Sequence, residues 1–261
     1  MSGQTVLELN GITMQIAGLT ALNKVSFSVE AGQIVSLIGP NGAGKTTTFN
    51  VISGYMRPTA GSVMLFGENI VGRSPDEIAA RGLVRTFQRT SVFDQCTVFD
   101  NLLTAFHLQG RCGLFRSLLR TSGFLREEAA LRARAAGMLE FLGLTHRADE
   151  LAVNLSYGEQ RLLGVGIGLA AQPKLLLLDE PAAGLNPSET EAFKYTIRRI
   201  SQLGVTVLLV EHDMHMVMSI SDHIIVLNHG HLIATGQPHD IQQDPEVIRA
   251  YLGSGVKRAQ A

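Results

Sequence analysis

The chain has 261 residues and a formal net charge of -1, from 22 Lys and Arg against 23 Asp and Glu. This balance argues against a protein that binds nucleic acid through a broadly basic surface, and two cysteines exclude a disulfide-rich scaffold. Hydrophobic residues make up 45% of the chain, which is enough for the core of one large domain or two small ones.

The amino-terminal segment lacks the basic and apolar regions of a signal peptide. The most apolar stretch runs from Leu162 to Leu178 and is interrupted by Gln172-Pro-Lys174. This interruption predicts a buried helix, a turn and a buried strand instead of a membrane span.

The first half begins with short hydrophobic runs that are typical of strands. Strands are expected at Val6–Leu9, Lys24–Val29, Ile34–Ile38, Ser62–Phe66 and Leu83–Phe87, and a helix at Lys45–Ser53. The segment Val98–Leu144 then changes to a Pro-free helical pattern, with expected breaks at Gln109–Gly113 and Thr121–Gly123.

The second half alternates helices with apolar strands. Helices are expected at Tyr157–Ala171, Ser188–Leu203 and Met214–Ser221, and strands at Leu175–Leu178, Val205–Val210, Ile224–Leu227 and Leu232–Ala234. This alternation predicts an α/β protein with a mainly parallel sheet that helices cover on both faces.

A glycine-rich loop between the strand Ile34–Ile38 and the helix Lys45–Ser53 fits the pattern G-x-x-x-x-G-K-[ST] over Gly39–Thr46. Glycines let successive backbone N–H groups point inward around an anion, and the helix start adds the positive end of its dipole. Lys45 is expected to reach the β- and γ-phosphates, and the Thr46 hydroxyl to bind Mg²⁺. The loop therefore predicts that the chain binds a nucleoside triphosphate.

Two acidic residues, Asp179 and Glu180, follow the buried strand Leu175–Leu178. Because ligands bind at the carboxyl ends of strands in open α/β sheets, Asp179 is expected to hold the metal and Glu180 to act as general base toward water. Two acids at a strand end are also common on solvated surfaces. The phosphate loop favours the functional interpretation.

Two more strand ends carry polar candidates. His212 follows Val205–Val210, and a neutral imidazole there can donate to a γ-phosphate. Gln88 follows Leu83–Phe87, and its amide can bind Mg²⁺ or water. Each is weak evidence by itself, because polar side chains at strand ends are commonly exposed.

The segment Leu155–Gln160 reads Leu-Ser-Tyr-Gly-Glu-Gln and begins a predicted helix. The Ser156 hydroxyl and the Gly158 N–H make a second anion-binding helix terminus, although Ser156 to Glu159 is also an ordinary capping box. Since the chain already has one phosphate loop, a second such terminus indicates a second nucleotide and a second protomer.

Taken in order, these motifs resemble the ATP-binding subunits of ABC transporters. The match comprises the Walker A loop (Gly39–Thr46), Gln88, the signature segment (Leu155–Gln160), the Walker B strand (Leu175–Asp179), Glu180, Ala183–Asn186 and His212. The branched-chain amino acid importer ATPases are similar also in Arg85–Gln88, Pro181–Pro187, the helical insert Thr104–Gly143 and Ala250–Gly253. The resemblance covers Val6 to Gly253.

The resemblance implies a P-loop NTPase fold of ABC type in one ATPase domain. Its core, with a mainly parallel sheet and an antiparallel β region, would comprise residues 1–92 and 157–253, its helical subdomain residues 93–156, and its tail residues 254–261. ATP and Mg²⁺ would be the cofactors. The implied catalytic residues are Lys45, Gln88, Glu180 and His212, and the implied metal ligands are Thr46, Gln88 and Asp179. The implied ATP contacts are Gly39, Pro40, Asn41, Gly42, Ala43, Gly44, Lys45, Thr46, Thr47 and Ile16, with Ser156 and Gly158 contacting the ATP of a facing cassette.

The implied partners are a second cassette, identical or a sister subunit, and separate transmembrane permease subunits. A periplasmic or extracellular solute-binding protein would act indirectly, and no nucleic acid is implied. The chain would lie in the cytoplasm on the inner face of the membrane. Asn186 would belong to a loop that crosses to the facing cassette, and Gln88 with the helical subdomain would couple the ATP state to the permease.

The implied function is ATP hydrolysis that powers the import of branched-chain or related amino acids. Import of urea, amides or other small carboxylates is an alternative, because a cassette does not touch the transported solute. A regulatory ABC module without useful turnover would also carry these motifs, and so would an ABC protein that acts on ribosomes or DNA.

Two features depart from the family pattern. Ile16 stands where an aromatic residue usually stacks on adenine, and weaker aliphatic packing predicts relaxed base selectivity. The helix after the signature carries Gly164, Gly166 and Gly168, where bulkier residues are usual. Each glycine costs up to about 1 kcal/mol in a helix interior, which predicts a less rigid helix.

Overall fold

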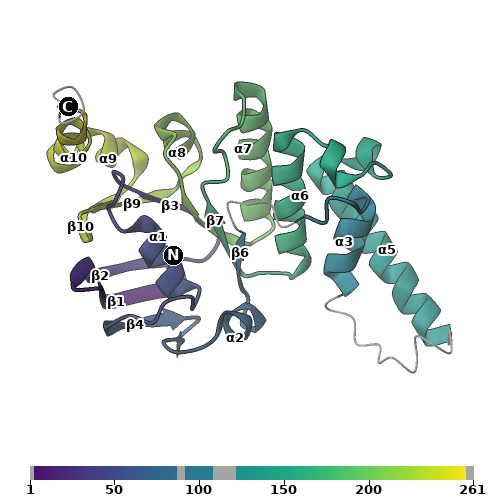
Figure 1. Ribbon diagram of the computed structural model, residues 1–261, viewed down its shortest axis with the longest axis horizontal. Coiled ribbons are helices and arrows are strands. Elements are labelled where there is room, and N and C mark those ends of the chain that lie inside the picture. The colour runs from purple at the N-terminus through teal and green to yellow at the C-terminus, as the bar shows by residue number, and fades with distance from the viewer. Residues whose placement is uncertain (1–2, 87–91, 108–121, 257–261) are drawn as a thin grey trace. The chain divides into compact units, whose positions relative to one another are not determined.

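The computed structural model describes residues 3–86, 92–107 and 122–256, and only the backbone of residues 122, 124 and 252–256. The chain divides into two compact units (Figure 1). Unit 1 comprises Met1–Gln88, Lys174–Ala183 and Thr190–Ala261, and unit 2 comprises Arg89–Pro173 and Gly184–Glu189. Each unit is described by itself.

Unit 1 contains a six-stranded sheet. Its strands are β3 (Ile34–Ile38), β6 (Leu83–Thr86), β7 (Leu175–Asp179), β8 (Thr206–Val210), β9 (His223–Asn228) and β10 (His231–Gly236). They lie in the order β10-β9-β3-β8-β7-β6, and all neighbours are parallel except β10 against β9. Every residue of β3 and β8 is buried, as in a parallel sheet with both faces covered. The order brings the carboxyl ends of β3, β8 and β7 together at one edge.

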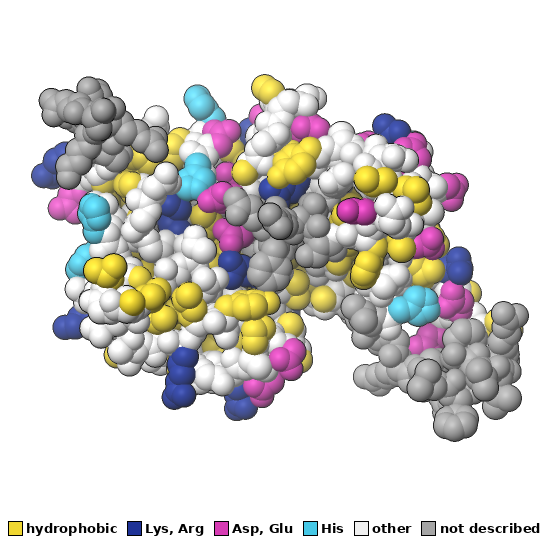
Figure 2. All heavy atoms as spheres, in the orientation of Figure 1, with side chains coloured by type: hydrophobic (Ala, Val, Ile, Leu, Met, Phe, Trp, Pro, Cys, Tyr) yellow, Lys and Arg dark blue, Asp and Glu magenta, His cyan; other side chains and the backbone are white. Residues whose placement is uncertain are grey.

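A second, four-stranded antiparallel sheet in unit 1 has the order β2-β1-β4-β5. It consists of β1 (Thr5–Ile16), β2 (Leu19–Glu30), β4 (Ala60–Leu65) and β5 (Glu68–Asn69). A two-residue turn joins β1 to β2, with positive φ angles of 47° at Ala17 and 84° at Gly18, as tight hairpins require. Figure 2 shows hydrophobic side chains at the surface over β1, β2 and β4, and Ile16 and Leu19 beside the turn are 40% and 76% exposed.

The helices of unit 1 are α1 (Lys45–Ile52), α2 (Pro75–Ala80), most of α7 (Pro187–Gln202), α8 (Met214–Ile220), α9 (Pro238–Gln243) and α10 (Pro245–Val256). One hydrophobic core joins the two sheets to α1 and includes Leu9, Val25, Leu37 and Phe49. A smaller cluster packs Val217 of α8 with Ile241 of α9 and Val247 of α10. The last two helices lie beyond the elements that the sequence predicted.

Unit 2 is helical. It contains α3 (Val98–His107), α5 (Ser122–Leu142), the short 3-10 helices η1 (Thr145–Arg147) and η2 (Ala152–Asn154), and α6 (Tyr157–Ala170). Its core joins apolar side chains from three helices, including Leu102 of α3, Leu139 of α5 and Leu163 of α6. Among the described residues, no helix is long and apolar enough to cross a membrane.

The structure confirms the predicted order of strands and helices. Helix α6 falls in unit 2, whose first segment extends to Pro173. The reason is packing, because α6 contacts α3 and α5 and shares their hydrophobic cluster. The boundaries that the resemblance implies for core and helical subdomain stay a prediction.

The predicted break at Gln109–Gly113 lies outside the described residues. The predicted break at Thr121–Gly123 is wrong for Ser122 and Gly123, which belong to α5. Of the predicted tail 254–261, residues 254–256 belong to α10, and the rest lies outside the described residues.

Candidate nucleotide site and signature helix

The phosphate loop follows β3 and ends at the start of α1, as predicted. A Cβ atom added to Gly39 would collide with the carbonyl oxygen of Leu227, so no side chain fits there. Gly44 is the N-cap of α1 and has a φ of 104°, a conformation that favours glycine. The fold therefore requires glycine at both ends of the loop and leaves its backbone free to surround an anion.

Lys45, the first residue of α1, is buried inside this loop. Its Nζ donates hydrogen bonds to the carbonyl oxygens of Gly39 at 2.6 Å and Pro40 at 3.0 Å. Burial lowers the pKa of Lys45, and the nearby negative charge of Glu180 opposes that change. The two hydrogen bonds hold the Lys45 side chain inside the loop, where an ammonium can neutralise phosphate charge.

A cavity of about 340 Å³ opens at this loop, within the range of small-molecule sites. Its lining includes the last residues of the loop, the residues that follow β7 and β8, and one residue of β2. They are Ala21, Asn41, Gly42, Ala43, Gly44, Lys45, Thr46, Thr47, Glu180 and His212. The structure therefore brings most of the predicted site residues of unit 1 together in one cavity.

Glu180 and His212 meet at the edge of the cavity. Their side chains are joined by a contact of 2.5 Å between Glu180 Oε1 and His212 Nε2. Glu180 has a positive φ of 48°, which is strained for a residue other than glycine. Strain of this kind persists where surrounding structure fixes it, and here a hydrogen bond of 2.9 Å from Glu180 N to the Val210 carbonyl does so.

Glu211, between the last residue of β8 and His212, supports the same edge. Its buried carboxylate accepts hydrogen bonds from the N–H of Ala182 at 2.6 Å and of His212 at 3.1 Å. Burial raises the pKa of Glu211, and these backbone hydrogen bonds partly oppose the rise. Glu211 therefore connects the segment that follows Glu180 to the end of β8.

Asp179 is paired with an arginine that the sequence pattern did not single out for this role. Arg85 Nη2 lies 2.6 Å from Asp179 Oδ2, and both side chains are largely buried. Arg85 Nη1 donates to Asn50 Oδ1 at 2.7 Å and to Ser53 Oγ at 3.1 Å. Arg85 thus connects the Walker B carboxylate to the end of α1, the helix that begins at the phosphate loop.

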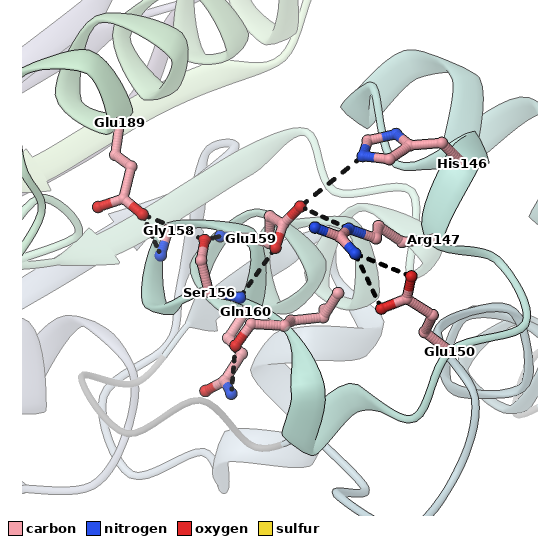
Figure 3. A network of polar contacts seen from close by, with 9 residues as sticks. His146, Arg147, Glu150, Ser156, Gly158, Glu159, Gln160 and Glu189 are labelled. Carbon is pink, nitrogen blue, oxygen red and sulfur yellow. Dashed lines mark hydrogen bonds and ion pairs between the residues drawn. The ribbon is translucent and has the colours of Figure 1, made fainter.

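The signature helix α6 begins in unit 2 with a complete capping box. Ser156 Oγ accepts from Glu159 N at 3.2 Å, while Glu159 Oε2 accepts from Ser156 N at 2.8 Å (Figure 3). Burial would raise the pKa of Glu159, but hydrogen bonds from Ser156 and Arg147 lower it overall. Both interpretations of this segment stay compatible with the structure: the capping box is present, and the Gly158 N–H is left for another acceptor.

That acceptor is Glu189, near the start of α7 (Figure 3). Glu189 Oε1 accepts from Ser156 Oγ at 3.1 Å and from Gly158 N at 3.3 Å. Its other oxygen accepts from the N–H of Asn186 at 3.1 Å. The Asn186 N–H holds the pKa of Glu189 below its ordinary value against the opposing effect of burial, and Ser156 and Gly158 lower it further.

Some predicted site residues lie elsewhere. Ile16 does not line the cavity and stands at the end of β1, whereas Ala21 of β2 does line it. Gln88 lies outside the described residues. Ser156 and Gly158 lie in unit 2. Their expected roles remain predictions.

Sequence reasoning missed Arg85, Glu189 and Glu211 as parts of these networks. A charged residue inside the predicted strand Leu83–Phe87 is a signal for Arg85. Asn186 followed three residues later by Glu189 matches a capping box, which points to the start of α7 but not to a contact with α6. Nothing local in the sequence identifies the Ala182 N–H as a partner of Glu211.

Comparison with known proteins fits this geometry. The family model described as ABC transporter matches residues 22–183, which include the phosphate loop, the signature and the Walker B strand. The chain belongs to the ABC transporter ATPase family. A second model, described as branched-chain amino acid ATP-binding cassette transporter, matches residues 231–257 of this cassette.

Two relatives match the cassette over nearly its whole length. The high-affinity branched-chain amino acid transport ATP-binding protein LivG of Escherichia coli (strain K12) is 47% identical over 251 residues, 96% of this chain and 98% of that protein. The corresponding protein BraF of Pseudomonas aeruginosa is 47% identical over 249 residues, 95% of this chain and 98% of that protein.

A solved structure confirms the fold. The crystal structure of the ADP conformation of MJ1267, an ATP-binding cassette of an ABC transporter, superposes with a TM-score of 0.83 at 32% identity. The match covers 95% of this chain and 99% of that one. The family and the fold class predicted from the motifs are thus confirmed.

Proposed function

We propose that this cassette binds ATP with Mg²⁺ at the loop Gly39–Thr46 and hydrolyses it to power the import of branched-chain amino acids through a separate permease. The cavity that joins the phosphate loop to Glu180 and His212 supports the ATPase role most directly. The amino acid class is supported by the 47% identity to LivG and BraF, which are named for branched-chain amino acid transport.

In this proposal the loop binds the phosphates. Its backbone N–H groups and the start of α1 attract negative charge. Lys45 exchanges its bonds to the Gly39 and Pro40 carbonyls for bonds to phosphate oxygens, and its buried ammonium is the main positive charge of the pocket. Thr47 and Asn41 line the same cavity and complete the contacts.

The donor set also fits Mg²⁺, which prefers oxygen ligands and few protein contacts. Thr46 supplies a hydroxyl and Asp179 a carboxylate, one of whose oxygens is already engaged by Arg85. Bound Mg²⁺ would neutralise phosphate charge. Gln88, the third predicted ligand, lies outside the described residues and stays a prediction.

Glu180 is the proposed general base. Its carboxylate borders the cavity and is held by His212, so it can accept a proton from a water that attacks the γ-phosphate. His212 keeps this carboxylate in place and can shift its hydrogen bond to the γ-phosphate when ATP is bound. The contact between the two side chains therefore links turnover to the presence of the γ-phosphate.

The assembly is part of the proposal. A second cassette, identical or a sister subunit, would contribute Ser156 and Gly158 to the γ-phosphate, and Asn186 would lie in the loop that reaches it. Permease subunits would dock the pair on the inner face of the membrane, and a solute-binding protein would deliver the cargo from outside. Gln88 and unit 2 would transmit the ATP state to the permease.

The decisive experiment replaces Glu180 with Gln. We expect steady-state ATPase activity to fall at least about 100-fold, because the amide cannot accept the proton, while ATP affinity by calorimetry changes by less than about threefold. Glu191→Gln, an exposed change on α7, serves as control and should retain full activity. Hydrolysis by Glu180→Gln at the wild-type rate would show that Glu180 is not the base.

The transported solute needs a separate test. The purified cassette, its permease and its solute-binding protein in vesicles should accumulate labelled leucine, isoleucine or valine when ATP is enclosed. Accumulation of urea, an amide or another carboxylate instead would reassign the substrate and leave the ATPase proposal intact.

A further inference from the structure

The start of α6 already holds an anion from the same chain. Glu189 Oε1 accepts from both groups that the proposed function assigns to the γ-phosphate of the facing cassette, the Ser156 hydroxyl at 3.1 Å and the Gly158 N–H at 3.3 Å (Figure 3). A Cβ atom on residue 158 would lie 2.7 Å from the carboxyl carbon of Glu189. The space that glycine leaves open is therefore the space that the carboxylate fills.

We propose that Glu189 is a further determinant of ATP-dependent pairing: it occupies the γ-phosphate position of the signature and must leave before the facing nucleotide can bind there. This inference rests on the proposed role of Ser156 and Gly158. It goes beyond that role by naming a residue of this chain that competes with the phosphate.

Ordinary helix capping does not account for the contact. As the third residue of α7, Glu189 completes a capping box with Asn186, since its Oε2 accepts from Asn186 N while its own N–H donates to Asn186 Oδ1 at 3.0 Å. That box uses one carboxylate oxygen. The other oxygen bonds to a different helix, α6, and these bonds are not needed to begin α7.

The competition is electrostatic as well as steric. A γ-phosphate brought to Ser156 and Gly158 would approach the negative charge of Glu189, and two like charges a few ångströms apart repel strongly outside bulk water. The α6 terminus can satisfy one anion, because its Ser156 hydroxyl and Gly158 N–H have one hydrogen each to donate. Two cassettes can therefore enclose the nucleotide only when the Glu189 side chain turns away from Ser156 and Gly158.

Glu189→Gln tests this step with little change in shape. Glutamine is also favoured at the third position of a capping box, so α7 should form normally, while the neutral amide competes less well for Ser156 and Gly158. A closed pair of identical cassettes contains two such sites. At each site, hydrogen bonds to the charged carboxylate of Glu189 are stronger than hydrogen bonds to a neutral glutamine amide. We expect the dissociation constant of the ATP-dependent pair to be at least about 10-fold lower than that of the protein with Glu189 intact.

The measurement is sedimentation velocity over a range of ATP concentrations, with Glu180→Gln present in every protein to prevent turnover. The proteins compared are Glu180→Gln alone and the double variants that add Glu189→Gln, Glu189→Ala or Glu191→Gln. Glu191 lies two residues further along α7, where it pairs with Lys194, so it controls for the loss of one negative charge. Tighter pairing with both Glu189 changes and unchanged pairing with Glu191→Gln would support the proposal.

Equal pairing of all four proteins, no pairing of any of them, or equal tightening by Glu191→Gln would overturn it. None of these results concerns hydrolysis by the protein with an intact Glu180. A failure of the Glu189 proposal is therefore distinct from a failure of the ATPase proposal, which the turnover of Glu180→Gln decides.

Discussion

Individual residues were predictable where a local motif defines their chemistry. Residues 41–46 of the loop and the pair of Glu180 and His212 line one cavity, because the residues that follow three neighbouring parallel strands share one edge of the sheet. Arg85 was not predictable as the partner of Asp179, which lies 94 residues further along the chain. A pairing of that kind depends on strand order, which no local pattern encodes.

The position of Asp179 is expected to depend on Arg85. Arg85→Lys keeps the charge but cannot reach Asp179, Asn50 and Ser53 at once, because lysine has a single nitrogen in place of the planar guanidinium. We therefore predict that ATP affinity measured with Mg²⁺ falls about 10-fold, while affinity measured in EDTA changes little. Isothermal titration in both conditions separates the two effects.

Arg81→Lys is the matched control for that experiment, because Arg81 pairs with Glu68 at an exposed site, where such pairs contribute little. It should alter neither affinity. Equal losses with and without Mg²⁺ in Arg85→Lys would show that Arg85 supports the fold in general and does not position the metal carboxylate.

Whole elements were predicted well where hydrophobic patterns are regular, as in β3, β7 and β8. The hairpin of β1 and β2 was underestimated, because bulges interrupt its alternation. One glycine inside α6 has a packing explanation. Gly166 lies where α6 packs on α3 and α5, and a Cβ there would be 2.5 Å from Leu142 and 3.1 Å from Leu102. Close packing therefore explains this glycine.

Two alanine substitutions test this explanation. Gly166→Ala gains helix propensity of about 1 kcal/mol but overpacks the core by about 1 to 3 kcal/mol, so we predict net destabilisation. Gly137→Ala in α5 meets no atom within 4 Å and should stabilise the protein by about 0.5 to 1 kcal/mol. Urea unfolding gives both values. Stabilisation by Gly166→Ala of the size seen for Gly137→Ala would refute the packing explanation.

At the scale of the whole molecule, the family and its α/β fold followed from the order of the motifs, and the comparisons confirm both. The grouping of α6 with α3 and α5 in unit 2 depends on packing that no local pattern of the sequence encodes. The signature motif begins α6, but the side chains that α6 packs against in unit 2 are apolar residues of α3 and α5, outside that motif. Membership of a packed cluster is a non-local property.

The stability of the molecule should depend on pH through Glu211. Burial raises its pKa above the ordinary value of 4.5, so the folded protein retains this proton to higher pH than the unfolded chain does. The contribution of Glu211 to the free energy of unfolding therefore falls as pH rises from 4.5 through the raised pKa.

The variant Glu211→Gln has no proton to lose at this position, and its amide oxygen can still accept the hydrogen bond from Ala182 N. We predict that its melting temperature rises relative to the wild type as the pH increases through this window, measured by circular dichroism at constant ionic strength, with exposed Glu191→Gln as control. A difference from the wild type that stays constant with pH would mean that the Ala182 contact holds Glu211 charged throughout.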